Sequence, residues 1–338
     1  VEASSHGLSP RTNRLGDVDF DAVVFTNVNH EHLEFHGTWE QYRDDKANLF
    51  RALNHSHKKT DIAGIAVAPE SFGVINMDDM SALYFADVTN HKKLNFSVSG
   101  KDATLTVKAV EHSAFNNWYN VFVAAENTAI DIRDRLPGSF NMRNVLAALL
   151  VVSGLTGVPV KEIAPLCPRL LPVRGRMNAI NKGQPFEVLV DYAHTPSSFQ
   201  TIFPPLKKRL APCGGRIISL FGSAGERDTK KRSEQGKIAA AYSDYIILAD
   251  EDPRGEEPMS ILEEIAAGVC AQSSFKQNEN LFLIPNRPVA IRKAISLARS
   301  GDLVLLLGKG HENTIIYKEN VMPFDEIAEA EKALKELL

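Results

Sequence analysis

Cysteine, long apolar runs and an excess of one charge are all scarce in this chain of 338 residues. Its three cysteines, Cys167, Cys213 and Cys270, lie far apart, which argues against a disulfide framework or a cysteine zinc site and suits a reducing cytoplasm. The apolar stretch Val145–Leu155 is shorter than the ~20 residues that span a bilayer. A net charge of −4 gives no sign of a surface for nucleic acid or membrane.

An initiator methionine and a signal-peptide pattern are also missing from Val1–His6, and we expect a fragment of a longer protein. The 338 residues are too many for one ordinary core and suit two domains. Because prolines and a cysteine break the pattern between Pro165 and Pro172, we expect the domains to cover residues 1–171 and 172–338.

The first half begins with a predicted strand and a helix, continues with a mostly strand region from Gly64 to about Ile130, and then has a second helix. A capping pattern at Thr38–Gln41 predicts a helix to about Leu53, and an Ala- and Leu-rich segment predicts another over Asn141–Ser153. Alternating apolar residues between them indicate a sheet that is partly antiparallel. The expected strands are Asp21–Thr26, Ile65–Ala68, Leu94–Val98, Thr104–Val107 and Tyr119–Val123.

The second half alternates short apolar runs with helical segments, the pattern of a parallel sheet covered by helices. The runs are Val188–Val190, Arg216–Phe221, Tyr245–Ala249, Leu281–Ile284 and Leu303–Leu307. The helices are expected over Lys230–Tyr242, Met259–Ala271 and Pro288–Arg299. The fold class is therefore α/β, with a mixed sheet followed by a mostly parallel one.

The loop Asp250–Arg254 follows one of these runs and places three acids and an arginine at a strand's carboxyl end, where open α/β sheets bind ligands. An arginine binds a carboxylate through two parallel hydrogen bonds, and acidic side chains bind an ammonium group. The alternative is a solvated turn shaped by Pro253. As a site, the loop would suit a small molecule with ammonium and carboxylate groups.

Three further polar loops follow strands of the same predicted sheet. Glycines in Leu220–Gly225 and Leu307–Glu312 let backbone amides approach a ligand, although neither stretch matches a phosphate loop or a dinucleotide fingerprint. In the third loop, Asp191 and His194 can contact a polar ligand, and Thr195 can cap a helix. Polar loops gathered on one sheet edge form a site more often than by accident.

Glu2, His32 and Lys46 form a candidate cation site in the first half, provided that the first residues form a strand end beside Asp21–Thr26. A carboxylate and an imidazole can bind a divalent cation. The alternative is an ordinary histidine-rich loop and a solvated helical lysine.

Together these segments resemble the Mur ligase family, and most closely its MurE branch, the ATP-dependent ligases that add a diamino acid to UDP-N-acetylmuramoyl-L-alanyl-D-glutamate. The matching stretches run in the family's order over essentially the whole chain. They are Glu2–His6, Phe25–Gly37, Lys46–Phe50, Gly138–Asn144, Val173–Arg176, Asp191–Pro196, Gly225–Asp228, Asp250–Arg254 and Gly308–Glu312. The resemblance implies the remainder of a central ATPase domain with a mixed sheet, then a Rossmann-like C-terminal domain.

The resemblance also implies roles for single residues, with ATP and Mg²⁺ as cofactors. Glu2 and His32 resemble Mg²⁺ ligands, and Lys46 resembles a lysine that reacts with CO₂ to form a carbamate, an oxygen donor that suits this hard cation. The catalytic positions would be Lys46, His32 and Arg176. The residues that resemble the ATP-facing set are Asn141, Asn144, Arg176, Asp191 and His194.

The substrate positions come from the same resemblance. Ser4 and Arg14 resemble the residues that hold the UDP-muramoyl-dipeptide, with Arg11 competing for the role of Arg14. The residues that resemble the diamino-acid pocket are Arg227, Glu251, Asp252, Pro253, Arg254, Gly308 and Glu312. The implied reaction forms an acyl phosphate on the D-glutamyl γ-carboxylate, which the incoming α-amine then attacks. We expect a cytoplasmic monomer that acts on small molecules, with no nucleic acid or membrane as partner.

Two departures from the family pattern matter. The phosphate loop, Gly-x-x-Gly-Lys-Thr or similar, is absent from the chain, as is the uridine-binding domain, and we therefore expect these 338 residues alone to lack ligase activity. Asp252 stands where diaminopimelate-adding enzymes usually have Asn. Its charge favours a terminal ammonium, as on lysine or ornithine, whereas Arg254 suits the distal carboxylate of meso-diaminopimelate. The sequence leaves the choice of diamino acid open.

Two other functions stay open at this point. One is a related ligase with another acceptor, such as the folylpolyglutamate synthase branch, although Asp252–Arg254 and Gly308–Glu312 argue against it. The other is a ligase-like protein that binds amino acid or nucleotide without turnover.

Overall fold

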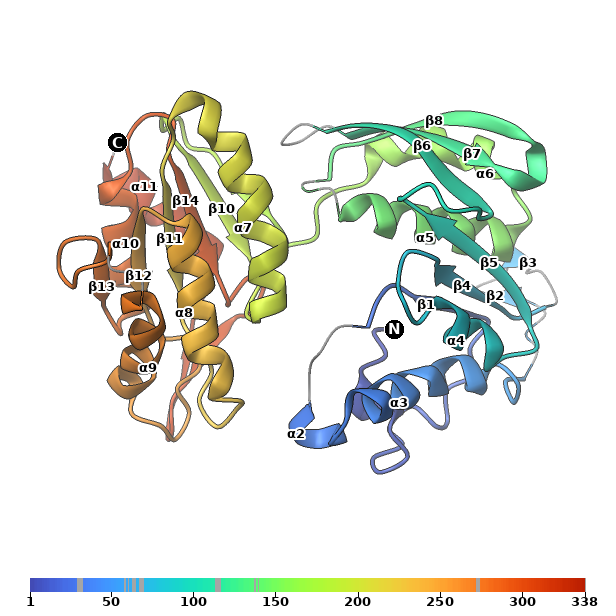
Figure 1. Ribbon diagram of the computed structural model, residues 1–338, viewed down its shortest axis with the longest axis horizontal. Coiled ribbons are helices and arrows are strands. Elements are labelled where there is room, and N and C mark those ends of the chain that lie inside the picture. Colours follow the sequence, from blue (N-terminus) through green and yellow to red (C-terminus); the bar gives the residue numbers. More distant parts are fainter. Residues whose placement is uncertain are drawn as a thin grey trace. The chain divides into compact units, whose positions relative to one another are not determined.

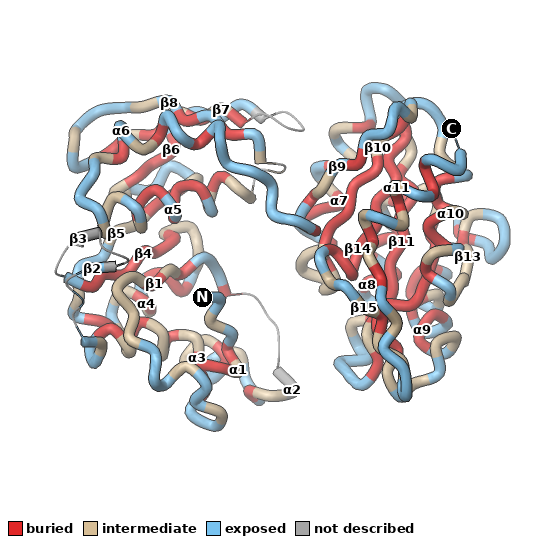
Figure 2. The backbone as a smooth tube through the Cα atoms, turned by 180° about the vertical axis from the view of Figure 1, so that it is seen from behind, coloured by how far each residue is buried: buried red, intermediate tan, exposed pale blue. Residues whose placement is uncertain are grey.

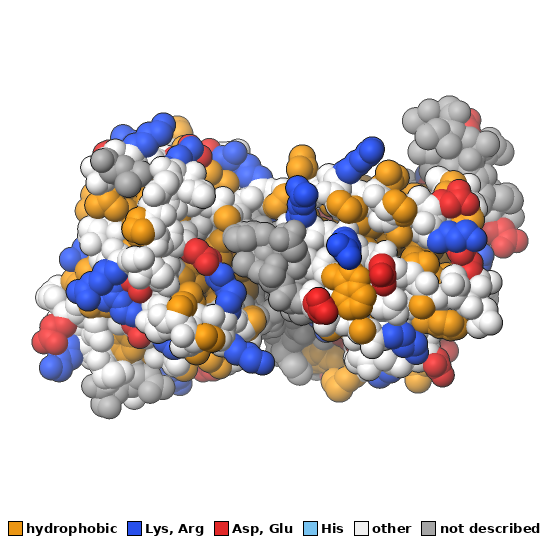
Figure 3. Space-filling model, turned by 90° about the horizontal axis from the view of Figure 1, so that it is seen from above, with side chains coloured by type: hydrophobic (Ala, Val, Ile, Leu, Met, Phe, Trp, Pro, Cys, Tyr) orange, Lys and Arg blue, Asp and Glu red, His pale blue; other side chains and the backbone are white. Residues whose placement is uncertain are grey.

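The computed structural model describes residues 1–28, 33–57, 59, 61–62, 65–66, 70–112, 117–136, 138, 140–271 and 274–337. The chain divides into two compact units, Val1–Leu171 and Pro172–Leu338. Each has a sheet with helices packed on it (Figure 1), and in each the buried residues concentrate in the sheet and in the helices that cover it (Figure 2). The face in Figure 3 carries basic and acidic side chains interspersed, as the small net charge leads one to expect.

The first unit is built on a mixed sheet with strand order β1-β4-β5-β6-β7-β8. Strands β1, β4, β5 and β6 are parallel neighbours, whereas β6, β7 and β8 pair antiparallel, which confirms the predicted mixture. A short antiparallel pair, β2 with β3, stands apart. The strands are Ala22–Phe25 (β1), Asp61–Ile62 (β2), Ile65–Ala66 (β3), Phe72–Asn76 (β4), Lys92–Ser97 (β5), Leu105–His112 (β6), Asn117–Val123 (β7) and Thr128–Asp134 (β8).

Helices α3 and α5 contribute residues to the two hydrophobic clusters of this unit. Helix α3 begins after Thr38, whose hydroxyl accepts a hydrogen bond from the Gln41 amide at 3.1 Å, so the predicted cap is confirmed. Helix α5 packs against β1, β4 and β5. The helices are Ser5–Leu8 (α1), Leu33–His36 (α2), Trp39–Ala52 (α3), Ala82–Asp87 (α4), Asn141–Thr156 (α5) and Val160–Ile163 (α6), with 3₁₀ turns at Ala124–Glu126 (η1) and Ala164–Arg169 (η2).

The expectation of a strand at the chain's beginning is wrong. The first four residues form no regular element, and α1 follows them, capped by the Ser4 side chain. Among the described residues no single helix is long and apolar enough to cross a membrane, and α5 reaches that hydropathy and length only together with the segment Val160–Arg169, at a bend of 115°.

The second unit is built on a sheet with strand order β13-β12-β11-β14-β10-β9. All neighbours are parallel except β9 and β10, so the predicted parallel sheet is confirmed. The strands are Asn178–Ile180 (β9), Glu187–Asp191 (β10), Ile217–Phe221 (β11), Tyr245–Leu248 (β12), Leu281–Leu283 (β13), Leu303–Leu307 (β14), and a separate antiparallel pair, Thr314–Ile316 (β15) and Val321–Pro323 (β16).

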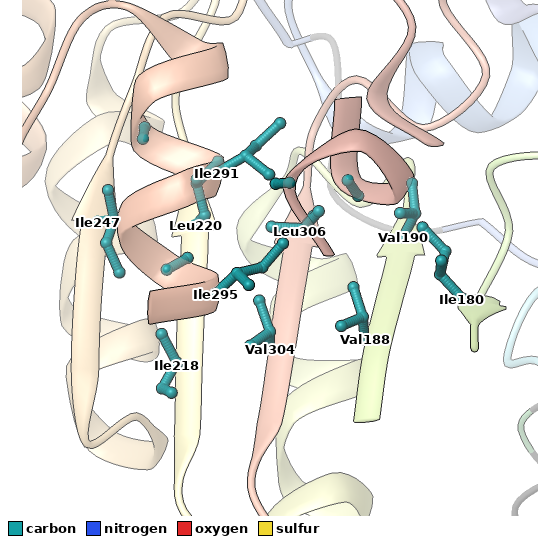
Figure 4. Packing of buried hydrophobic residues seen from close by; sticks show 14 of the residues in the cluster. Ile180, Val188, Val190, Ile218, Leu220, Ile247, Ile291, Ile295, Val304 and Leu306 are labelled. Atoms are coloured by element: carbon teal, nitrogen blue, oxygen red, sulfur yellow. The ribbon is translucent and has the colours of Figure 1, made fainter. Parts of the chain in front are cut away.

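Helices cover both faces of this sheet (Figure 1). They are Pro196–Leu210 (α7), Lys230–Tyr242 (α8), Pro258–Cys270 (α9), Arg287–Leu297 (α10) and Glu326–Leu337 (α11), with a 3₁₀ turn at Ala211–Cys213 (η3). Ile291 and Ile295 of α10 pack against inward-facing residues of β10, β11, β12 and β14 (Figure 4). Because neighbouring parallel strands end together, the loops after β10, β11, β12 and β14 share one sheet edge.

Candidate functional site

A pocket of about 850 Å³ lies beside β1 in the first unit. Three residues named from the sequence, Glu2, Ser4 and Lys46, line it together. Lys46 is half-buried on α3, and its ammonium lies 5.2 Å from the ring centroid of Tyr42. The pocket thus brings a lysine together with a carboxylate and a hydroxyl that lie more than 40 positions before it in the chain.

The fit of a divalent cation to this pocket depends on Lys46. His32 lies outside the described residues, and in the part of the chain that is described no three His, Cys, Asp or Glu side chains could hold a metal ion. An ammonium repels a cation, whereas a carbamate on the same nitrogen would add oxygen donors to the pocket that Glu2 also lines. The described members of the predicted set therefore fit Mg²⁺ only with Lys46 carbamylated.

The residues predicted to hold the UDP-muramoyl-dipeptide differ in whether they line the pocket. The Ser4 hydroxyl accepts a hydrogen bond from the Gly7 amide at 3.1 Å and so caps α1 at the pocket wall. Arg14 is exposed and does not line the pocket. Arg11 is also exposed, and its guanidinium donates to the Phe35 carbonyl at 2.6 Å.

Asn141 and Asn144 lie in the first turn of α5. The Asn144 amide donates to the Asn141 side-chain oxygen at 2.9 Å, so the two predicted ATP-facing residues form a pair at the helix's beginning. Backbone amides at a helix N-terminus attract anions.

Asp191 is buried at the end of β10, and its carboxylate holds two backbone segments together. One oxygen accepts from the Met177 amide and the other from the Ala193 amide, each at 2.8 Å. Burial raises its pKa, against these two hydrogen bonds. Both oxygens are thus engaged, and the contacts fix the turn that carries Arg176 and the loop that carries His194.

Arg176 and His194 meet at Tyr192. The Arg176 guanidinium lies 5.0 Å from the Tyr192 ring centroid, and the His194 ring lies 4.7 Å from it. His194 Nδ1 is 2.9 Å from the Tyr192 carbonyl, which can only accept, so Nδ1 carries a hydrogen. Thr195 caps α7 in a reciprocal box with Ser198, which confirms the capping expectation.

The acids of the loop after β12 are buried and have different partners. Tyr317 donates to Asp250 at 2.8 Å. Asp252 accepts from Lys309 Nζ at 2.8 Å and from the Ile316 amide at 3.0 Å through one oxygen, Oδ1. The Asp252 charge therefore already faces an ammonium of the chain itself, which weakens its use as an argument for a particular diamino acid.

Three buried polar atoms of this loop have no hydrogen-bond partner in the described part of the chain. They are Oδ1 of Asp250, Oε2 of Glu251 and Nε of Arg254. Arg254 adopts a left-handed backbone, with φ +54°, and its amide donates to the Ile316 carbonyl at 2.9 Å. Since buried polar groups are normally paired, these acid oxygens and the guanidinium nitrogen suit a ligand that carries both an ammonium and a carboxylate.

The glycine loops close around these acids. A Cβ on Gly308, which has φ +104°, would lie 2.8 Å from Oε2 of Glu251, and one on Gly225 would lie 1.9 Å from the Pro253 carbonyl oxygen. Glu312 bonds Lys309 at 2.6 Å, whereas Arg227 is exposed at the rim of the loop after β11. The structure thus gathers the predicted amino-acid set on one edge, with Arg227 at its periphery.

Sequence reasoning missed three residues of this edge. Lys309 and Tyr192 lie inside quoted motifs, so the motifs pointed to them without assigning them a role. Arg287 had no signal, yet it is fully buried and donates to the carbonyls of Asp250 and Leu307 at 3.0 and 2.6 Å. Arg287 also forms a two-pronged ion pair with Glu326 of α11. It therefore holds the ends of β12 and β14 in place.

Comparison with known proteins places this geometry in a family. Residues 1–152 match the Mur ligase middle domain, and residues 175–310 match the Mur ligase glutamate ligase domain. The chain belongs to the Mur ligase family.

Relatives of this Mur ligase chain are similar over nearly all of it. A UDP-N-acetylmuramyl-tripeptide synthetase of Treponema denticola is 52% identical over 99% of the chain and 62% of its own length. A UDP-N-acetylmuramoyl-L-alanyl-D-glutamate–2,6-diaminopimelate ligase of Caldanaerobacter subterraneus is 33% identical over 98% of the chain and 64% of its own length. The chain thus spans less than two thirds of these relatives.

The solved structure of a UDP-N-acetylmuramoyl-L-alanyl-D-glutamate–2,6-diaminopimelate ligase is 27% identical. It has a TM-score of 0.57 and covers 99% of this chain and 64% of its own. A Thermotoga maritima UDP-N-acetylmuramate–alanine ligase, at 15% identity and a TM-score of 0.61, shares the fold.

Proposed function

We propose that the protein is an ATP-dependent amide-forming ligase that adds a diamino acid to UDP-N-acetylmuramoyl-L-alanyl-D-glutamate, through an acyl phosphate. The observation that carries this proposal is the loop after β12, where Oε2 of Glu251 and Nε of Arg254 are buried without a hydrogen-bond partner in the described part of the chain. The names of the similar proteins, a tripeptide synthetase and a diaminopimelate ligase, support the same reaction.

The proposal assigns the amino acid to the second unit. Arg254 would bind a carboxylate of the amino acid, and Glu251 and Glu312 would bind an ammonium. Asp252 and Lys309 would set the net charge around Arg254, Glu251 and Glu312. The incoming α-amine must be neutral to attack a carbonyl, so these acids should hold the other ammonium and leave the α-amine free.

The proposal assigns the nucleotide and cation to the remaining predicted residues. Asn141, Asn144, Arg176, Asp191 and His194 would face ATP, with Asp191 acting through the backbone segments that it holds. Glu2, His32 and carbamylated Lys46 would hold Mg²⁺, which supplies positive charge against the phosphate oxygens. Ser4 and Arg14 would contact the UDP-muramoyl-dipeptide. A monomeric state and a cytoplasmic location stay predictions.

A ligation assay with a panel of amino acids tests this function. The product of the complete gene, given ATP, Mg²⁺ and the dipeptide substrate, should release phosphate with one or more of meso-diaminopimelate, L-lysine and L-ornithine. Arg254→Ala should raise the KM for the amino acid by at least tenfold, which is about 1.4 kcal/mol. The control is Arg299→Ala, which changes an exposed arginine outside the site.

Other outcomes would point elsewhere. Turnover with glutamate and a folate would replace this function by that of the folylpolyglutamate branch, and nucleotide binding without turnover would make the protein a binder. Residues 1–338 contain no Gly-Lys-Thr or Gly-Lys-Ser phosphate loop, and we expect them to show no turnover on their own. Full ligase activity from these 338 residues would disprove that expectation.

The Lys46 carbamate has its own test. Lys46→Ala should abolish activity, and formate or acetate should restore part of it by supplying the missing anionic oxygens. Loss of activity that neither acid rescues would argue against a simple anionic role.

A further inference from the structure

Tyr192 connects two groups of residues that the proposed function treats separately. It lies in the loop between β10 and α7, and no role was assigned to it from the sequence. Its ring contacts residues proposed to face ATP, and its hydroxyl contacts a residue proposed to face the amino acid. Each contact lies within the second unit.

Three cationic or titratable side chains pack against the ring of Tyr192. The Arg176 guanidinium lies over it at 5.0 Å, and the rings of His194 and His311 lie at 4.7 and 4.8 Å, tilted by 59° and 52°. A guanidinium over an aromatic face is attracted by the ring quadrupole. Gly310 lets the loop after β14 approach, since a Cβ there would lie 2.7 Å from Cβ of Tyr192.

The hydroxyl of Tyr192 belongs to a different chain of contacts. It donates to Oε1 of Glu312 at 3.3 Å, and Oε2 of Glu312 lies 2.6 Å from Nζ of Lys309. Lys309 is fully buried and bonds Asp252 at 2.8 Å. Burial and the nearby Glu312 raise the pKa of Tyr192 to about 12, so the hydroxyl stays a donor at neutral pH.

We propose that Tyr192 is a positioning residue that couples the nucleotide-facing and amino-acid-facing residues of the second unit. Its ring orients Arg176 and His194, and its hydroxyl orients Glu312 and, through it, the Lys309–Asp252 pair. When ATP or the amino acid binds and orders the Tyr192 ring, the residues that face the other substrate are held in the arrangement that this substrate needs. This inference rests on the proposed function.

Two substitutions separate the ring from the hydroxyl. Tyr192→Phe keeps the ring and removes the donor to Glu312, so the KM for the amino acid should rise on the order of 5- to 10-fold while the KM for ATP stays within about twofold. Tyr192→Leu removes both, so both KM values should rise. Both variants are assayed in the product of the complete gene, and Tyr242→Phe on α8, stacked on Phe203, is the matched control.

A coupling measurement completes the test. In the unchanged protein the KM for ATP should fall when the amino acid becomes saturating, and Tyr192→Leu should remove that dependence. A Tyr192→Phe variant with an unchanged KM for the amino acid, or a Tyr192→Leu variant that keeps the dependence, would overturn the inference. If the unchanged protein ligates no diamino acid at all, the proposed function fails instead, so the two failures are distinguishable.

Discussion

The residues predicted to hold the cation and the dipeptide in the first unit are more exposed than the acids of the loop after β12 in the second unit. In the first unit, Glu2, Ser4 and Arg14 are exposed, and Lys46 is half-buried. In the second, Asp250, Glu251 and Asp252 are buried, and Lys309 and Arg287 beneath them are fully buried. The second site is therefore held by its own unit's contacts before any ligand binds, and changes there should affect stability as well as binding. Changes in the first unit should mainly affect binding.

Arg287→Ala tests this contrast with the largest expected effect. Removing the arginine leaves Glu326 as a buried, uncompensated charge and frees two strand-end carbonyls, which should lower the free energy of unfolding by about 3–5 kcal/mol. Denaturant unfolding measures it, with Arg292→Ala, which breaks more exposed pairs on the same helix, as the control. Equal losses in the two variants would contradict the assigned role of Arg287.

The protonation of Asp250 predicts how the stability of the protein changes with pH. Burial raises its pKa to about 6, despite the hydrogen bond from Tyr317 and the charge of Arg287, with Glu257 adding to the rise. The folded state therefore holds this proton more tightly than the unfolded chain, and stability falls as the pH rises from about 4 to 6. The loss at neutral pH is on the order of 3 kcal/mol.

Asp250→Asn should remove that loss and flatten the dependence, because an amide oxygen can still accept from Tyr317. Asp302→Asn is the control of opposite sign. Burial alone would raise the pKa of Asp302, but hydrogen bonds from Arg216 hold it below its usual range, so its stabilisation is present above the unfolded pKa and is lost on acidification. Unfolding curves from pH 4 to 8 that coincide for Asp250→Asn and the unchanged protein would contradict the prediction.

Asp252→Asn concerns selectivity more than stability. Lys309 faces two acids, Asp252 and Glu312, and the substitution leaves it one, while the amide oxygen can still accept from Lys309 and Ile316. The lost charge should shift preference toward a diamino acid with a distal carboxylate by about 1–3 kcal/mol, roughly 5- to 150-fold. Competition between meso-diaminopimelate and L-lysine measures the ratio. Glu263→Gln, an exposed change on α9, should leave that ratio unaltered.

The difference in burial between the two units also bears on how much of the fold and the site could be predicted from the sequence. The parallel strands of the second sheet could be predicted because buried parallel strands are apolar throughout and alternate with helices, whereas the antiparallel edge strand β9 was not predicted. Strand β4 was missed because Gly73 resembles a turn residue, although a Cβ there would lie 2.6 Å from the Phe50 ring. Arg287 was missed because its burial depends on Glu326, 39 positions away. Motifs located the site loops, but pairings such as Lys309 with Asp252 exist only in the folded chain.

Ser4→Ala should have the smallest effect on stability of these substitutions. It also tests whether the exposed Ser4 serves as a helix cap or contacts the substrate. The Ser4 hydroxyl caps α1 through the Gly7 amide, and losing a cap costs about 0.5–2 kcal/mol, toward the low end for so short a helix. Ser4→Thr keeps a capping hydroxyl and should restore stability. If Ser4 serves only as a cap, the KM for the UDP-muramoyl-dipeptide should follow stability in both variants. A KM that rises in Ser4→Ala at full stability, or that Ser4→Thr fails to restore, would instead assign the hydroxyl to the substrate, as the family resemblance implies.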